Sequence, residues 1–275
     1  MMMAGKRPKK KIRRSKPSRP SRKAEAAYRA DLQNIVNMMR QVTEARLLPA
    51  LKQYAPEFER KRAGDSLQMT DRWANDFVNI FDLMSKDLGQ IDELSRRLAA
   101  TAVNRQAAQT DQQLASGLSK SLGIGIDVAN TIKGLNVGTE ISAATAVNVD
   151  LIKSLPSQYL DKTRSLVLNG AAQGRRHEDL AEDIKKQLNV SETRAKLIAR
   201  DQMAKVNASI TEAKQQALGI IEYEWSTAGD ERVRESHADN DGKIFRWDSP
   251  PAETGHPGDD VNCRCVAIPI INFDD

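Results

Sequence analysis

Cysteine is almost absent from this 275-residue sequence, in which Cys263 and Cys265 stand one residue apart. A disulfide between such close neighbours would close a small, strained ring, so a disulfide-stabilised secreted scaffold is excluded. The basic N-terminus is followed by no apolar segment of the kind that marks a secretory signal. We therefore expect a reducing cytoplasm, in which the two thiols stay free or bind a metal.

Long apolar runs and aromatic residues are also scarce. No run approaches the roughly 18 to 20 apolar residues that cross a bilayer, so we expect no membrane-spanning segment. Aromatic residues make up 4% of the chain, so Leu, Ile, Val, Ala and Met must supply most core contacts. The glycine motifs of P-loop nucleotide hydrolysis, dinucleotide binding and the serine-hydrolase elbow do not occur, so these three enzyme classes have no motif support.

Acidic residues are missing from the first 23 positions, which hold eleven Lys or Arg and three prolines. Because the whole chain carries a net charge of +5, the remaining residues sum to −6. A segment this charged and this poor in apolar side chains cannot offset its ordering entropy, so we predict a disordered basic arm over residues 1–23.

The predicted partner of the basic arm is double-stranded DNA, bound without sequence preference through its phosphates. A solubilising tail or a contact with an acidic protein surface is the alternative. The candidate DNA-binding residues are Lys6, Arg7, Lys9, Lys10, Lys11, Arg13, Arg14, Lys16, Arg19, Arg22 and Lys23.

Helical periodicity governs most of the chain after the arm. Apolar stripes at three- and four-residue steps run over 28–42 and over 73–98, with residues 55–66 as a predicted connection between them. The pattern over residues 148–188 predicts three short helices, separated by Pro156 and by glycines. A long helix is predicted next, from an N-cap at Ser191 to Gly219.

Beyond Gly219 the apolar period changes from about 3.6 to 2. The segments IIEYEWSTA (220–228), KIFRW (243–247) and CVAIPII (265–271) are strand candidates. The predicted fold class is therefore α+β, with mainly helical N-terminal and central parts and a small antiparallel β-rich C-terminal unit from about residue 220.

Both cysteines and two of the three histidines fall within 29 residues of one another. On one strand, Cys263 and Cys265 would point to the same face, where imidazoles from nearby loops could complete a tetrahedral site. We therefore predict a candidate structural Zn²⁺ site made by His237, His256, Cys263 and Cys265. The alternative is that the histidines cap turns while the cysteines are small core residues.

The residues of the last third resemble a known signature. A Trp followed by TAGDERVRESH, then DGKIF, GHPG and CRC, appears here in the order found in the phage Mu F-type head morphogenesis proteins, also called minor head or minor capsid proteins. The resemblance covers about 148–270, is looser over 100–147, and is not evident in the first hundred residues. It implies three parts: the basic arm, a variable portal- or capsid-contacting helical region over 24–147, and a head morphogenesis domain over 148–275.

The resemblance implies a function in a tailed phage or prophage. It predicts a non-enzymatic minor head protein that assembles with the portal and other head proteins, in the head interior or at the portal vertex, after assembly in the host cytoplasm. Two alternatives remain. One is a metal-dependent nuclease or other enzyme that acts during DNA entry, for which Asp230 and Asp241 are the nearby carboxylates; the other is a nucleic-acid-binding protein unrelated to phage.

Overall fold

The structure is a computed structural model that describes residues 11–64, 72–123 and 128–273. Its contacts divide the chain into two units, each made of discontinuous segments. The sheet unit contains residues 1–24, 103–144 and 201–275, and the helical unit contains 25–102 and 145–200. This division differs from the predicted sequential one at residue 148, because single long helices contribute to both units. The predicted mainly helical α+β fold class is confirmed.

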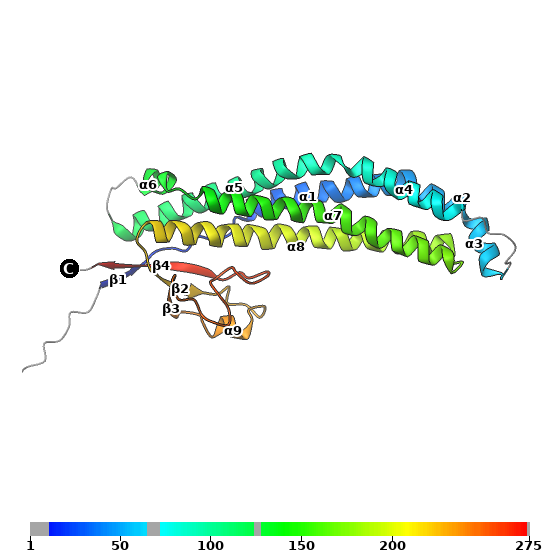
Figure 1. Cartoon of the computed structure of the whole chain (residues 1–275). Coiled ribbons are helices and arrows are strands. Elements are labelled where there is room, and N and C mark those ends of the chain that lie inside the picture. Colours follow the sequence, from blue (N-terminus) through cyan, green and yellow to red (C-terminus); the bar gives the residue numbers. More distant parts are fainter. Residues whose placement is uncertain (1–10, 65–71, 124–127, 274–275) are drawn as a thin grey trace, which may run out of the picture. The chain divides into compact units, whose positions relative to one another are not determined.

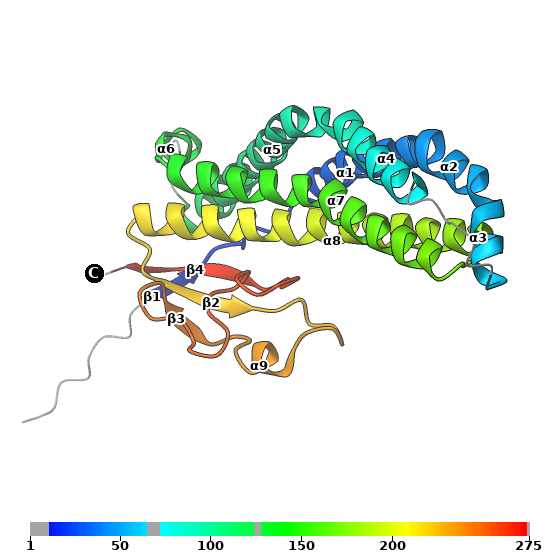
Figure 2. The same ribbon diagram turned by 45° about the vertical axis from the view of Figure 1, so that its right-hand side comes forward.

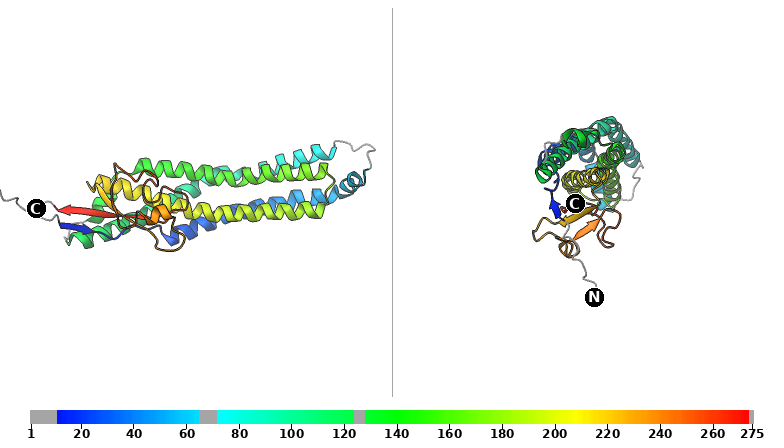
Figure 3. Two further views of the ribbon diagram at one scale, coloured as in Figure 1. Left: turned by 90° about the horizontal axis from the view of Figure 1, so that it is seen from below. Right: turned by 90° about the vertical axis from the view of Figure 1, so that its left-hand side faces the viewer.

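Antiparallel helices build the helical unit, and Figures 1 and 3 show them side by side. Its helices, some of which extend into the sheet unit, are α1 (Arg22–Val42), the π-helical turn η1 (Thr43–Leu47), α2 (Leu48–Gln53), α3 (Ala55–Arg62), α4 (Arg72–Leu88), α5 (Gln90–Leu122), α7 (Gly138–Ala172) and α8 (His177–Ala217).

An aromatic cluster holds one end of the helical unit together. The ring of Phe77 lies 6.2 Å from that of Phe58, 6.3 Å from that of Trp73 and 5.6 Å from that of Tyr54. Phe58 and Phe77 are almost fully buried. The apolar stripe predicted over 73–98 therefore faces the core, and the chain bends at Gly89, between α4 and α5.

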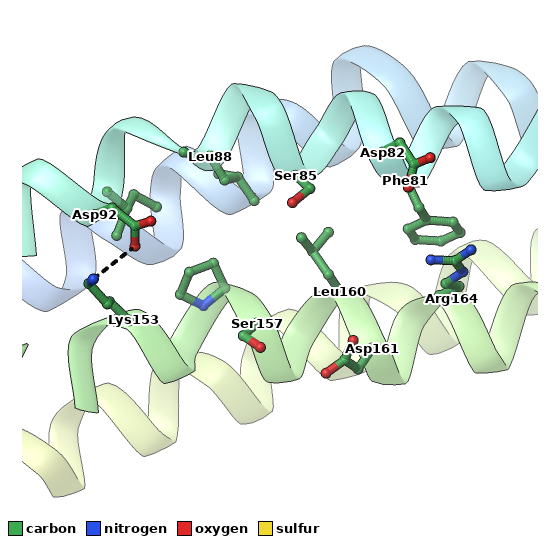
Figure 4. Close-up of a pocket in the computed structure, with 13 residues that line it drawn as sticks. Phe81, Asp82, Ser85, Leu88, Asp92, Lys153, Ser157, Leu160, Asp161 and Arg164 are labelled. Carbon is green, nitrogen blue, oxygen red and sulfur yellow. Dashed lines mark ion pairs between the residues drawn. The ribbon is translucent and has the colours of Figure 1, made fainter. Parts of the chain in front are cut away.

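A groove with a volume of about 270 Å³ lies between α4–α5 and α7 in the helical unit. Figure 4 shows charged side chains from both sides of it, among them Asp82, Asp161 and Arg164, with an ion pair at 3.6 Å between Lys153 and Asp92. None of the site residues predicted from the sequence lines this groove.

Two helical predictions are corrected by the structure. The region expected to form three short helices belongs to α7, which continues through the buried Pro156, and to the start of α8. Ser191 lies inside α8, where its hydroxyl donates to the Gln187 carbonyl four residues back instead of capping a helix. The expected connection over 55–66 contains α3, which tolerates Pro56 because proline suits a first helical turn.

The sheet unit contains α6 (Val128–Gly134), the short helix α9 (Glu235–Ala238) and a four-stranded antiparallel sheet. Its strands, in spatial order, are β1 (Lys11–Arg14), β4 (Val266–Phe273), β2 (Glu222–Ser226) and β3 (Ile244–Arg246). The three C-terminal strands match the predicted ones. The path from α8 into β2 turns at Gly219 (φ +76°), where Ile220 N–H bonds the Gln215 carbonyl, as expected of a helix C-terminus.

The N-terminal strand corrects the prediction of a disordered arm. β1 pairs with β4, for example Arg14 with Ile270, and Figure 2 shows the two strands side by side. Residues 15–21, called the strap below, lie against α5, and α1 begins at Arg22. The prediction is thus wrong for residues 11–23, because backbone pairing and side-chain amides hold a segment that has little apolar surface of its own.

Four of the candidate DNA-binding residues, Lys6, Arg7, Lys9 and Lys10, lie outside the described residues. Within the described ranges, no helix combines the length and the apolar character that crossing a membrane would need.

Candidate metal centre

The core of the sheet on one side is a small cluster of buried side chains. They are Tyr223 and Trp225 from β2, Trp247 after β3, Cys263 and Cys265 in the loop just before β4, and Ala267 in β4. Both cysteines are free thiols. The short α9 carries His237, which is 2% exposed and packs edge-on against Trp225 at 5.4 Å between ring centroids. The sequence thus brings an imidazole and two thiols into one apolar environment.

Three of the four predicted ligands meet at one point. His237, Cys263 and Cys265 each offer one ligand atom, and these atoms lie within 4.8 Å of one another. His237 Nδ1 is 3.4 Å from Cys265 Sγ and 3.5 Å from Cys263 Sγ. A tetrahedral Zn²⁺ with usual bond lengths would separate a nitrogen and a sulfur ligand by about 3.5 Å. The two nitrogen–sulfur distances therefore fit a zinc ion bound between these donors.

The imidazole of His237 is oriented by a carboxylate that sequence reasoning missed. Asp260 Oδ2 lies 2.9 Å from His237 Nε2, which leaves Nδ1 directed at the two sulfurs. Asp260 is itself held by Arg234, whose Nη1 donates to it at 3.3 Å. A carboxylate on the second ring nitrogen is the usual support of a metal-binding histidine. The acidic pair before Cys263 in the sequence was the signal that could have found it.

The two thiols shift each other's pKa in opposite directions. The pKa of Cys263 is lowered to about 6, chiefly by a hydrogen bond from the Cys265 thiol and also by the backbone N–H groups of Cys265 and Gly258. The pKa of Cys265 is raised, first because it donates to Cys263 and then because it is buried. The buried indole N–H of Trp225 acts in the opposite direction, because its hydrogen bond to Cys265 lowers the pKa of that thiol.

His256, the fourth predicted ligand, does not join this group. Its Nδ1 lies 2.9 Å from the Tyr223 hydroxyl, and its ring packs 5.0 Å from that of Trp247. Its loop is docked on α8 through Gly258 (φ +106°), where a Cβ would lie 2.4 Å from that of Ala208. His256 therefore fastens the loop to the sheet core.

The two candidate carboxylates of an enzyme have other partners. Asp230 forms a bidentate ion pair with Arg264, with both oxygens 2.5 Å from guanidinium nitrogens. Asp241 accepts a hydrogen bond from the backbone N–H of Thr227 at 2.7 Å, which closes the turn between β2 and β3. Neither belongs to the three-residue group, and among the described residues no other acidic or histidine side chain does.

Comparisons with known proteins agree with the resemblance noted in the sequence. Residues 161–268, which include His237, Cys263 and Cys265, match the family described as Phage Mu protein F like protein. An uncharacterized protein of Haemophilus influenzae is 37% identical over 272 residues, which are 97% of this chain and 58% of that protein.

A more distant similarity, 26% identity over 165 residues, links the chain to the minor head protein GP7 of Bacillus phage SPP1, covering 50% of this chain and 54% of that protein. The chain therefore spans a little over half the length of these curated relatives. No solved structure matches it.

Proposed function

We propose that the chain is a minor head protein acting in head morphogenesis of a tailed phage or prophage, because residues 161–268 match the family described as Phage Mu protein F like protein. The similarity to a phage minor head protein supports this proposal. The proposed location is the head interior or the portal vertex, with other head proteins as partners.

Removing the gene from the phage that carries it tests the proposal. We expect fewer DNA-filled heads, restored by a plasmid copy, and we expect the chain in purified virions by mass spectrometry. The proposal would be overturned if purified virions contain none of the chain and if the deletion phage gives a normal yield of virions. Portal and terminase genes beside this gene are also expected; an isolated gene would favour the non-phage alternative.

We place the contact with the portal on the helical unit. Four large apolar side chains are 42–52% exposed there: Leu83, Val147, Val190 and Leu197. Val190 and Leu197 are seven residues apart on α8, so they share one face of that helix. Co-expression with the portal protein of the same genome should give a complex that Val190→Asp with Leu197→Asp weakens. The matched control is Val261→Asp, which alters a 60% exposed valine of the sheet unit.

We propose that Zn²⁺ is bound by His237 Nδ1 and the thiolates of Cys263 and Cys265, where it would cross-link α9 to the start of β4. The fit of the donor spacing supports the ion, and the burial of all three side chains supports a structural role. Elemental analysis of the purified chain should give about one zinc per molecule. Full-length protein with normal hydrogen exchange in β4 and no metal would overturn the proposal.

The role we propose is structural and not enzymatic. The three side chains are at most 7% exposed, so a substrate has no direct access to them. We expect no hydrolysis of DNA by the purified chain in the presence of Mg²⁺ or Zn²⁺. DNA cleavage that copurifies with the chain and disappears with Cys263→Ala would favour the nuclease alternative.

The proposed second partner is double-stranded DNA, contacted by the basic residues of the arm. Its support is charge: eleven cations without an acidic residue in the first 23 positions. Filter binding of DNA fragments of unrelated sequence should show salt-dependent, sequence-independent affinity. An affinity for DNA that does not change between about 50 and about 300 mM salt would contradict an electrostatic contact.

A further inference from the structure

The strap follows one stripe of α5. At its start the Arg14 carbonyl accepts from the Ser121 hydroxyl, and at its end Ser21 N–H donates to Gln106 Oε1 at 3.0 Å. Between these points it crosses Gly117, where an added Cβ would lie 2.6 Å from the Ser15 hydroxyl oxygen. The strap is therefore laid closely along a helix and is not a loose tail.

The length of this contact shows that the strap is extended. Fifteen helical steps separate residues 106 and 121, which is about 22 Å. Seven steps separate residues 14 and 21 of the strap, which is also about 22 Å at the polyproline II rise of 3.1 Å per residue. Pro17 and Pro20 restrict themselves and the residues before them to extended conformations.

Two side-chain amides clamp the strap by its backbone. Gln113 accepts from Arg19 N–H at 2.7 Å and donates to the Arg19 carbonyl at 3.0 Å. Asn207, from α8, donates to the Ser18 carbonyl at 3.2 Å and accepts from the Ser18 hydroxyl at 2.8 Å. These hydrogen bonds involve backbone groups and the Ser18 hydroxyl, so the charged side chains of the strap are left free to bind another molecule.

Burial along the strap has a period of three. Ser15, Ser18 and Ser21 are 4%, 1% and 9% exposed, so they face the protein. The residues that follow each serine are Lys16, Arg19 and Arg22, and all three are exposed. Three residues make one turn of polyproline II, so Lys16 and Arg19 lie on one edge of the strap, and Arg22 follows it as the first residue of α1.

These cations differ from the two that precede them. Arg14 pairs with Glu224 on β2, and Arg13 donates to the Ser121 carbonyl at the end of α5. For Lys16, Arg19 and Arg22, no side-chain hydrogen bond or ion pair is formed with any other described residue.

We propose that Lys16, Arg19 and Arg22 form a preformed cationic strip that binds the sugar–phosphate backbone of double-stranded DNA. The proposal rests on the DNA contact of the proposed function and locates it on a folded element. Successive cations on the strip are about 9 Å apart and the three span about 19 Å. That span covers five to six base-pair steps, roughly, at 3.4 Å each. Because the strap is already ordered, binding costs little additional conformational entropy.

Charge-removal variants of the full chain test the strip. The strip variant carries Lys16→Gln, Arg19→Gln and Arg22→Gln; the control variant carries Lys52→Gln, Arg60→Gln and Lys61→Gln, which removes the same charge from exposed sites of the helical unit. A third variant replaces Lys6, Arg7, Lys9 and Lys10 by Gln. In filter binding against salt, we expect the strip variant to bind at least about tenfold more weakly with a salt slope reduced by about three, and the control variant to bind like wild type.

Each result decides between the two proposals. If the strip variant binds like wild type and the third variant does not, the strip is wrong while the DNA contact stands. If wild type shows no salt-dependent binding, the proposed DNA contact fails as well. If the strip variant instead loses an acidic head protein and keeps DNA, the strip serves a protein partner and the proposal is overturned.

The clamps test whether the strip must be preformed. Asn207→Ala with Gln113→Ala releases the strap without changing any charge. Hydrogen exchange should become faster in residues 15–21, and DNA affinity should fall a few-fold with an unchanged salt slope. Faster exchange with unchanged affinity would show that the order of the strap does not matter for binding, and this part of the proposal would be wrong.

Discussion

The two units of this chain are stabilised in different ways. In the helical unit, buried aliphatic and aromatic side chains from several helices form the core, including the rings around Phe77. In the sheet unit, the core on one side of the sheet has six buried residues, and two of them are cysteines beside a buried histidine. A small apolar core supplies little stability by itself. The comparison indicates that this side of the sheet depends on a few directional contacts, whereas the helical unit depends on apolar area.

Removing the cysteines should destabilise the protein more than truncating any apolar side chain of either unit. Cys263→Ala with Cys265→Ala should remove the proposed Zn²⁺ and destabilise the sheet by more than about 5 kcal/mol, because metal binding contributes directly to the free energy of folding. Hydrogen exchange followed by mass spectrometry should show β2 and β4 opening while α4 stays protected.

A chelator should reproduce this effect in wild type, and His177→Ala should not, since His177 lies in the helical unit and outside the metal group. Equal loss of protection in both units would contradict the distinction between them.

Truncating Phe77 is the reciprocal experiment. This side chain is fully buried and contacts three other rings, so Phe77→Ala should destabilise the helical unit by about 3–5 kcal/mol. The content of the proposed Zn²⁺ should stay at about one per chain. Leu83→Ala, at a side chain that is 42% exposed on the same helix, is the matched control and should change stability by less than about 0.5 kcal/mol. Urea denaturation followed by helical circular dichroism measures both.

Gly258 tests how tightly the loop that carries His256 is docked. At φ +106° a side chain is strained, and the Cβ of Gly258→Ala would meet that of Ala208 at 2.4 Å. Both effects together should cost about 2–4 kcal/mol in the sheet unit. Gly229→Ala also has a positive φ but meets nothing within 4 Å, so it should cost only about 1 kcal/mol. Similar costs for the two variants would show that the loop does not pack on α8 as described.

The periodicity of apolar residues predicted the presence of helices and strands better than it predicted the residues at which they end. The change of period at Gly219 gave the three C-terminal strands, because the alternation of Tyr223 and Trp225 with glutamates reflects one buried face. Pro156 and Ser191 were misleading, since tertiary packing keeps a helix continuous through residues that would end it in isolation. Helix propensity and capping preferences consider only neighbouring residues in sequence, so they cannot account for the tertiary packing that keeps α7 and α8 continuous.

The candidate site was predicted in part for a similar reason. Residue type and proximity along the chain selected His237 and the two cysteines, but they could not exclude His256, which is nearer to the cysteines in sequence than His237 is. Asp260 was missed because its role depends on the tautomer and direction of the His237 ring, which only the fold fixes. The ordered strap was missed because the amides that hold it, Gln113 and Asn207, lie about 90 and 190 residues away along the chain.

The smallest expected effect concerns a surface ion pair of the sheet unit. Arg246 and Asp248 form a two-bond pair at 2.9 and 2.7 Å after β3, but their side chains are 48% and 66% exposed. Solvent screens such a pair, so Arg246→Ala should leave both the urea midpoint of the sheet unit and the content of the proposed Zn²⁺ unchanged. A clear fall of that midpoint would mean that exposed charges, and not the buried cluster, hold this unit together.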